Sequence, residues 1–220
     1  MIYENPYMNG QIWPQLNILE ILRQRNPLVI CITNDVVRTF TANGLLAIGA
    51  SPVMSECSDD LKDLIVHASA LLINIGTLTP DKVSYYKEAI ALAKKHEVPI
   101  VLDPVGCHAG AYRLSVVLDL IKTGTISLLR GNQSEIKAIY DALSPNNQAD
   151  TATTGKGVDG GQVEDSAVVV YRLARLINCP VVATGEEDYV SDGTRVFAVP
   201  HGHSIMSAVT GTGCLLGAVL

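Results

Sequence analysis

The sequence lacks three features that would place it in other classes of protein: a basic surface, a long apolar run and a leader segment. The net charge is −6, so the composition does not suit nucleic-acid binding. No apolar run reaches the roughly 18 residues of a membrane span, and the opening "MIYENPYMNG" lacks the basic-then-apolar order of a signal peptide. These absences favour a cytoplasmic globular protein, and residues 1–220 are expected to form a single domain.

Paired cysteines are missing as well. The five cysteines are odd in number and widely spaced, and none belongs to a C-x-x-C pair of the kind that binds zinc or exchanges disulfides. We expect most of them to be small buried residues; they are Cys31, Cys57, Cys107, Cys179 and Cys214.

What the sequence does contain is a regular alternation of apolar and amphipathic stretches. Five short apolar runs are typical of strands buried on both faces, namely residues 28–32, 70–75, 99–103, 126–129 and 180–184. Between them lie stretches of helical character, namely residues 83–97, 134–143 and 164–177. The alternation predicts an α/β fold with a mostly parallel central sheet covered by helices on both faces.

Two further segments have their own signals. Residues 188–199 contain Asp192-Gly193 between two short β-like runs, which predicts a hairpin. Residues 144–162 are rich in Gly, Thr and Asn and are expected to form a long mobile loop.

Polar and glycine residues follow each predicted strand. Ligands of open parallel sheets bind outside the carboxyl ends of the strands, so these residues predict one shared crevice. The simpler interpretation is that Gly, Asn and Asp are common strand terminators. The residues are Thr33-Asn34, Gly76-Thr77, Asp103-Pro104, Arg130-Gly131-Asn132 and Thr184-Gly185.

The stretch "AVTGTGCLLGAVL", residues 208–220, joins a glycine-spaced turn to an apolar segment. A helix that starts near Cys214 leaves its first N–H groups without partners, and such a terminus suits a phosphoryl group. The alternative is a glycine-rich start that serves only to pack the helix. The sequence contains neither a Walker loop nor a G-x-G-x-x-G motif after its first predicted strand.

From Asn26 onward the chain contains a series of motifs that together carry a family likeness. They are, in order, residues 26–54, "LLINIGTLT", "VLDPVG", "RGNQSEI", "GKGVD", "VVATGEEDYVSDG" and "VTGTGCLL". With them the chain resembles the hydroxyethylthiazole kinase family of thiamine salvage, and this is a likeness that spans most of the sequence. It implies a ribokinase-like fold and MgATP-dependent phosphorylation of the primary alcohol of 4-methyl-5-(2-hydroxyethyl)thiazole. It also implies a homotrimer with thiazole sites at the subunit interfaces.

The resemblance assigns roles to individual residues. Asn34, Met54 and Gly211 correspond to positions that meet the thiazole alcohol, although Asn34 could instead cap the following helix. Arg130 and Thr184 match residues that contact ATP, whereas an unpartnered Arg is usually only solvated. Magnesium keeps several waters and needs few carboxylates; its implied ligands are Glu135, helped by Asn132 and Asp103.

The catalytic turn implied by the resemblance consists of Gly211, Thr212, Gly213 and Cys214. Cys214 stands where related sugar kinases have an aspartate that takes the proton of the attacking hydroxyl. A thiol at a helix start is expected to ionise more readily than a free thiol, whose pKa is about 8.5. Cys214 is therefore the candidate proton acceptor, and Cys214→Asp is expected to retain activity.

Family members continue for several helices beyond this cysteine, and these helices cover the adenine pocket. The single domain of residues 1–220 is therefore expected to lack those helices and to leave apolar surface uncovered. The alternatives are a thiazole or vitamin-precursor binding protein without an ATP site, a hydroxymethylpyrimidine kinase, and a repair dehydratase of the same fold.

Overall fold

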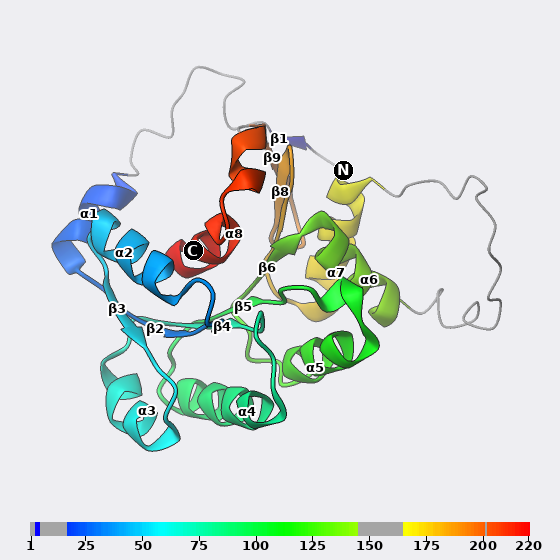
Figure 1. The fold of residues 1–220 in the computed structure, drawn as a ribbon. Helices are drawn as coiled ribbons and strands as arrows, with labels where there is room; N and C mark the ends of the chain where they lie inside the picture. Colours follow the sequence, from blue (N-terminus) through cyan, green and yellow to red (C-terminus); the bar gives the residue numbers. More distant parts are fainter. Residues whose placement is uncertain (1–2, 5–16, 145–164, 201) are drawn as a thin grey trace.

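The computed structural model describes residues 3–4, 17–144, 165–200 and 202–220. One sheet of nine strands runs through the molecule in the order β1-β9-β8-β7-β6-β5-β4-β2-β3 (Figure 1). The strands are β1 (Tyr3–Glu4), β2 (Leu28–Ile32), β3 (Ser51–Met54), β4 (Ala70–Asn74), β5 (Ile100–Asp103), β6 (Leu128–Asn132), β7 (Val181–Thr184), β8 (Asp188–Ser191) and β9 (Val196–Val199). The pairs β7–β8 and β8–β9 are antiparallel and all others are parallel, which confirms the predicted sheet and the hairpin over residues 188–199.

Eight described helices cover this sheet on both faces, as predicted. Helices α3 to α7 lie on one face, and α1, α2 and α8 lie on the other (Figure 1). The helices are α1 (Ile18–Arg25), α2 (Arg38–Ile48), α3 (Ser58–Leu64), α4 (Pro80–Lys95), α5 (Ala111–Ile121), α6 (Gln133–Leu143), α7 (Ser166–Ile177) and α8 (Thr212–Val219). None of the described helices is long and apolar enough to span a membrane.

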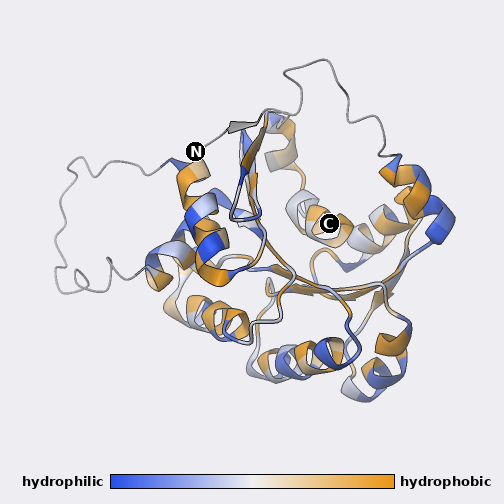
Figure 2. Ribbon diagram, turned by 180° about the vertical axis from the view of Figure 1, so that it is seen from behind, coloured by the Kyte–Doolittle hydropathy of each residue, from blue (hydrophilic) through white to orange (hydrophobic). Residues whose placement is uncertain are grey.

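The central strands are buried on both faces because their apolar runs supply side chains to two separate clusters. In β4, Leu71 and Ile73 pack into the large cluster beneath α3 to α7, whereas Leu72 between them joins a smaller cluster with α2 and α8. The same alternation in β5 sends Leu102 to the large cluster and Val101 to the small one. Hydrophobic residues accordingly run along the central strands and the helices beside them (Figure 2).

Two helices begin where sequence signals place their first turns. Thr79 caps α4 by accepting a hydrogen bond from the Lys82 N–H at 3.2 Å, and Pro80 occupies the first turn. Asn132 and Glu135 form a capping box at the start of α6. The predicted loop over residues 144–162 lies outside the described residues, apart from Ser144.

Candidate active site

Polar side chains gather on the α8 face at the carboxyl ends of the central strands. Asn74 and Asp103 are register partners at the ends of β4 and β5. Because Ile73 and Leu102 face the large cluster, the next residue of each strand faces α8 instead. Arg130 in β6 and Thr184 at the end of β7 continue the row. The alternation of the strands thus places polar groups beside α8 while the opposite face stays apolar.

These side chains form a continuous polar network, which we define as Asn34, Asn74, Asp103, Arg130 and Thr184. Asn34 Nδ2 donates to Asn74 Oδ1 at 2.9 Å, and Asn74 Nδ2 donates to Asp103 Oδ2 at 2.7 Å. Arg130 Nη1 lies 3.6 Å from Asp103 Oδ1, and Arg130 Nη2 donates to Thr184 Oγ1 at 2.6 Å. The prediction that residues from separate strand ends come together is confirmed for four of these five side chains, and Asn74 adds to it.

Helix α8 begins against this network. Gly211 precedes the helix with φ +93°, a left-handed conformation that favours glycine, and a Cβ there would lie 2.8 Å from Val37 Cγ1. A Cβ on Gly213 would lie 3.0 Å from both Nη atoms of Arg130. Gly211 therefore lets the turn lie close to α2, and Gly213 lets the start of α8 lie close to the Arg130 guanidinium. The helix begins at Thr212, two residues earlier than the sequence indicates.

The first N–H groups of α8 supply the expected anion-binding character. Leu215 N donates to Gly211 O at 2.8 Å, and the N–H groups of Thr212, Gly213 and Cys214 have no hydrogen-bond partner among the described residues. Residues 211 to 216 are partly exposed rather than packed into the core. The Thr212 hydroxyl donates back to the carbonyls of Met206 and Val209, so this residue can serve an anion through its backbone only.

Cys214 lies beside Asn34, whose Nδ2 donates to Sγ at 3.4 Å. The expectation that this thiol ionises more readily than a free one is wrong. Burial, followed by the negative charge of Asp103, raises the pKa of Cys214, whereas hydrogen bonds from Asn74 and Asn34 and the charge of Arg130 lower it. The position of this thiol at a helix start therefore does not decide its ionisation, because burial outweighs the hydrogen bonds and the positive charge that favour the thiolate.

Asp103 and Arg130 form a buried pair. The Asp103 side chain is completely buried, and burial raises the pKa of its carboxyl group to about 7 against the opposing charge of Arg130. Asp103 Oδ1 and Arg130 Nε have no hydrogen-bond partner in the described part of the chain. Arg130 is only 6% exposed, so the alternative of a solvated surface arginine is wrong.

Asn34 is held by the network rather than by a helix. Its Oδ1 accepts the N–H of Val36 at 3.1 Å, and α2 begins at Arg38 without a side-chain cap. The alternative of Asn34 as a helix cap is therefore wrong, and the residue is buried beside Cys214.

Glu135 and Asn132 have structural partners of their own. Glu135 Oε1 accepts the Gly106 N–H and Oε2 accepts the Asn132 N–H, each at 2.7 Å, while Asn132 Oδ1 accepts the Glu135 N–H at 2.8 Å. Each carboxylate oxygen keeps a second lone pair. The described residues contain no group of three or more His, Cys, Asp or Glu side chains that could hold a metal ion. A magnesium ion would therefore depend on few protein oxygens and on water, which is its usual preference.

The remaining predicted residue, Met54, ends β3 and packs, partly buried, against the small apolar cluster on the α8 face. Sequence reasoning missed two residues that shape the site. Asn74 interrupts an otherwise apolar run, and that interruption is the signal that could have identified it. Arg113 of α5 donates to the carbonyls of Ile75, Val105 and Gly76 at 2.8 to 3.0 Å, and so joins the loops after β4 and β5.

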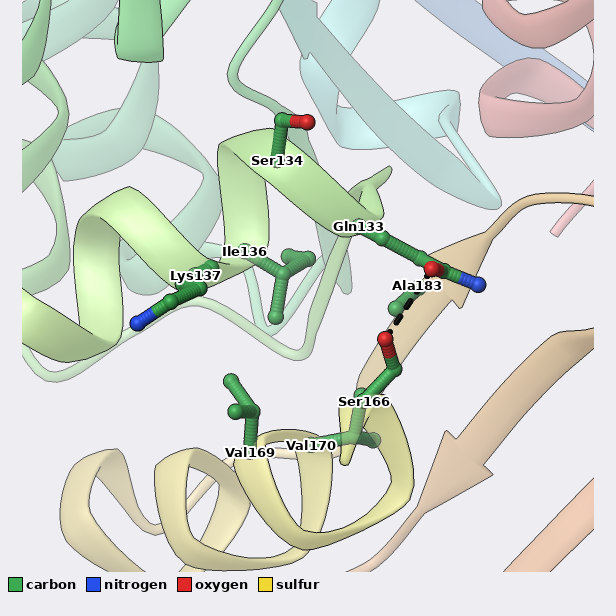
Figure 3. Close-up of a pocket in the computed structure, with 8 residues that line it drawn as sticks. All are labelled: Gln133, Ser134, Ile136, Lys137, Ser166, Val169, Val170 and Ala183. Carbon is green, nitrogen blue, oxygen red and sulfur yellow. Dashed lines mark hydrogen bonds between the residues drawn. The ribbon is translucent and has the colours of Figure 1, made fainter. Parts of the chain in front are cut away.

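A cavity of about 180 Å³ lies elsewhere, between α6 and α7 (Figure 3). Ser166 Oγ donates to Gln133 Oε1 at its margin at 3.0 Å. The lining residue Ala183 belongs to the large apolar cluster, and no member of the polar network lines the cavity. Its lining is Gln133, Ser134, Ile136, Lys137, Ser166, Val169, Val170 and Ala183.

The fold defines the general class of the molecule. The fold is ribokinase-like: a ribokinase-like superfamily protein from Enterococcus faecalis V583 superposes with a TM-score of 0.57 at 16% identity, over 87% of this chain and 68% of that one. The model of the hydroxyethylthiazole kinase family matches residues 19–220. The chain belongs to the hydroxyethylthiazole kinase family.

Individual relatives agree with this membership. The hydroxyethylthiazole kinase of Streptococcus agalactiae serotype III is 53% identical over 202 residues, which are 92% of this chain and 75% of that protein. The corresponding protein of Streptococcus suis is 50% identical over the same share of this chain and 74% of its own length. The structure of hydroxyethylthiazole kinase from Pyrococcus horikoshii OT3 superposes with a TM-score of 0.79 at 40% identity, over 91% of this chain and 72% of that one.

Proposed function

We propose that this protein transfers the γ-phosphoryl group of ATP to the primary hydroxyl of 4-methyl-5-(2-hydroxyethyl)thiazole, as a single kinase domain over residues 1–220. The observation that carries the proposal is the start of α8, where the N–H groups of Thr212, Gly213 and Cys214 have no partner in the described part of the chain and the Arg130 guanidinium lies close by. Unpaired donors at a helix start stabilise the charge that spreads over the oxygens of a transferring phosphoryl group. The names of the relatives supply the thiazole alcohol as acceptor.

The family resemblance supplies the binding roles of the individual residues. Gly211 presents backbone next to the reacting hydroxyl, and Met54 offers a polarisable thioether to the flat sulfur heterocycle. Asn34, which lies beside Cys214, lines the same thiazole pocket. Arg130 and Thr184, which contact each other at 2.6 Å, bind phosphate oxygens of ATP. The unpaired Nε of Arg130 supports this role because it is a donor without a protein acceptor among the described residues.

In the reaction, the hydroxyl oxygen forms a bond to the γ-phosphorus while the bond from that phosphorus to the bridging oxygen breaks and ADP leaves. The hydroxyl proton passes to Cys214 Sγ. Burial raises the pKa of this thiol, so turnover rises with pH as more of it becomes thiolate. A modest base is sufficient because the transition state is loose and the proton departs late.

Magnesium fits the oxygen donors at this end of the sheet. Glu135, through water and with Asn132 beside it, and Asp103 Oδ1, which accepts no hydrogen bond within the described residues, are the groups that would hold the ion. When bound, the ion neutralises charge on the phosphate oxygens. The role of the chain's own residues is to orient the Glu135 carboxylate, which the N–H groups of Gly106 and Asn132 do.

Assembly as a homotrimer with sites at subunit interfaces is part of the proposal and rests on the family resemblance. Exposed apolar side chains on the α8 side, among them Phe40, Leu46 and Val209, offer surface that association would bury. A cytoplasmic location is supported by five free cysteines, three of them buried. Light scattering on the purified protein distinguishes a trimer from its 23.5 kDa subunit.

The test is to incubate the protein with MgATP and separate alcohols, and to detect products by mass. Phosphorylated 4-methyl-5-(2-hydroxyethyl)thiazole is expected, with the hydroxymethylpyrimidine alcohol converted poorly. Faster conversion of the pyrimidine would reassign the substrate. Binding of the thiazole without phosphate transfer, under conditions where a related kinase is active, would instead identify a binding protein.

A further inference from the structure

Asn74 is a fully buried amide at the centre of the polar network, and no role in the proposed reaction has yet been assigned to it. Its side chain has three hydrogen bonds with protein groups: to Asp103 at 2.7 Å, from Asn34 at 2.9 Å and from the Gly76 N–H at 3.0 Å. A buried amide with its hydrogen bonds satisfied in this way is strongly constrained in orientation.

The orientation of this amide follows from its partners. The Gly76 N–H can only donate, so it requires the oxygen of Asn74 on its side. The Asp103 carboxylate accepts, so it requires the nitrogen on the other side. Two independent partners thus fix the same orientation.

That orientation determines how Asn34 is held. Because Asn74 Oδ1 is an acceptor, Asn34 must present Nδ2 to it, and its own Oδ1 turns to the Val36 N–H. The nitrogen carries two hydrogens, and the second is directed at Cys214 Sγ, 3.4 Å away. The sulfur consequently receives a hydrogen bond from the network, which favours the form that accepts a proton.

We propose that Asn74 is a positioning residue: held by the Gly76 N–H and the Asp103 carboxylate, it fixes the Asn34 amide so that Asn34 donates to Cys214 Sγ. Its importance for turnover rests on the proposed phosphoryl transfer, but the alignment itself is a property of the chain. A glycine at position 76 supports the arrangement, since a Cβ there would lie within 2.8 Å of the Asn34 side chain.

The charged groups around the thiol act in opposite directions. Asp103 from β5 opposes ionisation of Cys214, whereas Arg130 from β6 and the two amides favour it. Removing Asn74 also disturbs its bond to Asp103, so a single variant would mix two effects. Asn34→Ala leaves the bond between Asn74 and Asp103 in place and removes the Asn34 donor to sulfur, while the Asn74 amide keeps its own effect on the thiol.

The test measures iodoacetamide alkylation of Cys214 against pH by peptide mass, with Cys57→Ser in every protein to remove the other exposed thiol. Loss of a hydrogen bond to the thiolate is worth about one pKa unit, so Asn74→Leu is expected to slow alkylation at pH 8 about tenfold. Asn34→Ala should give a shift of similar size. Asn74→Leu added to Asn34→Ala should slow alkylation by less than the product of the two single effects, because both variants remove the bond from Asn34 to Sγ.

Thr41→Val is the matched control, because it also replaces a buried polar side chain, one without a hydrogen-bond partner among the described residues, and should leave the alkylation profile unchanged. Where Asn74→Leu does not fold, judged by circular dichroism, Asn74→Ser replaces it, since the shorter side chain cannot reach Asn34. An unchanged profile in the folded Asn74 variant, or additive effects in the double variant, would overturn the inference.

Kinase assays separate this inference from the proposed function. In an active enzyme, Asn74→Leu should lower kcat about tenfold with the KM for ATP unchanged, because the proposed ATP contacts are made by Arg130 and Thr184 and not by Asn74. A wild-type protein that phosphorylates no alcohol would remove the proposed function, and the alkylation profiles would still decide whether Asn74 aligns Asn34 with the thiol.

Discussion

Strands β4 and β5 present apolar side chains to one face of the sheet and polar side chains, at their carboxyl ends, to the other. Toward α3 to α7, β4 and β5 contribute Leu71, Ile73, Ile100 and Leu102 to a large apolar cluster. Toward α8, the same two strands end in Asn74 and Asp103, as part of a buried polar network that continues through other strands.

The residues that stabilise the fold therefore lie mainly on one face of the sheet, and the residues proposed to act in the reaction lie on the other. Burial of apolar area on the first face supplies most of the stabilisation. The second face instead carries buried polar groups, which cost free energy unless every partner is present. A substitution on the apolar face of a strand should therefore lower the stability, whereas one on its polar face should lower kcat.

The largest expected effect is on stability, from Leu102→Ala on the apolar face. Leu102 is completely buried, so its truncation should lower the free energy of unfolding by about 2–5 kcal/mol. The kcat of the folded protein should remain unchanged. Urea denaturation followed by circular dichroism measures the first quantity, and Leu46→Ala on the exposed side of α2 is the control. A large fall in kcat would show that the two faces are not separable.

Gly213→Ala should produce the opposite pattern on the polar face. The new Cβ would lie 3.0 Å from both Nη atoms of Arg130, so the guanidinium must shift away from the helix start. We expect kcat to fall about 10²–10³-fold, the usual effect of removing one transition-state donor. The free energy of unfolding should change by less than about 1 kcal/mol, because alanine is a better helix former. Gly110→Ala, where a Cβ meets nothing within 4 Å, is the matched control at another helix start.

Cys214→Ala tests the proton acceptor and should have a somewhat smaller effect. Loss of a general base typically reduces the rate by about 10²-fold or more. Cys214→Asp should retain activity, because a carboxylate can accept the same proton. Since burial raises the pKa of the thiol, turnover of the wild type should rise through the alkaline range, and the aspartate variant should lose this rise. An unchanged turnover number in Cys214→Ala would assign the chemistry to the N–H groups alone.

The sequence allowed most of the sheet to be predicted, because fully buried strands leave continuous apolar runs. Strand β6 begins two residues later than predicted and extends to Asn132. Arg130 and Asn132 look like loop residues in the sequence, yet Arg130 stays in the strand because buried Asp103 and partly buried Thr184 supply partners. These partners lie on the neighbouring strands β5 and β7, which are far from Arg130 along the sequence, so no local sequence pattern indicates them.

The candidate site was predictable as a set of strand ends, but not as a network. Register decides that Asn74 and Asp103 meet, and register depends on the pairing of β4 with β5. The pKa of Cys214 could not be predicted either. A helix start favours the thiolate, but the burial that opposes it comes from packing of α8 on the sheet.

The smallest expected effect concerns which thiols can be reached in the folded protein. Burial raises the pKa of Cys31 and of Cys107 to about 12, so only about 10⁻⁴ of either is thiolate at pH 8. Iodoacetamide at that pH should modify exposed Cys57 first and partly exposed Cys214 second, and the other three only after unfolding in urea. Cys31 packs in the small cluster on the α8 side, and Cys107 packs in the large cluster. Alkylation of Cys31 as fast as that of Cys214 would mean that the whole α8 face opens in the folded protein, and that the buried polar network opens with it.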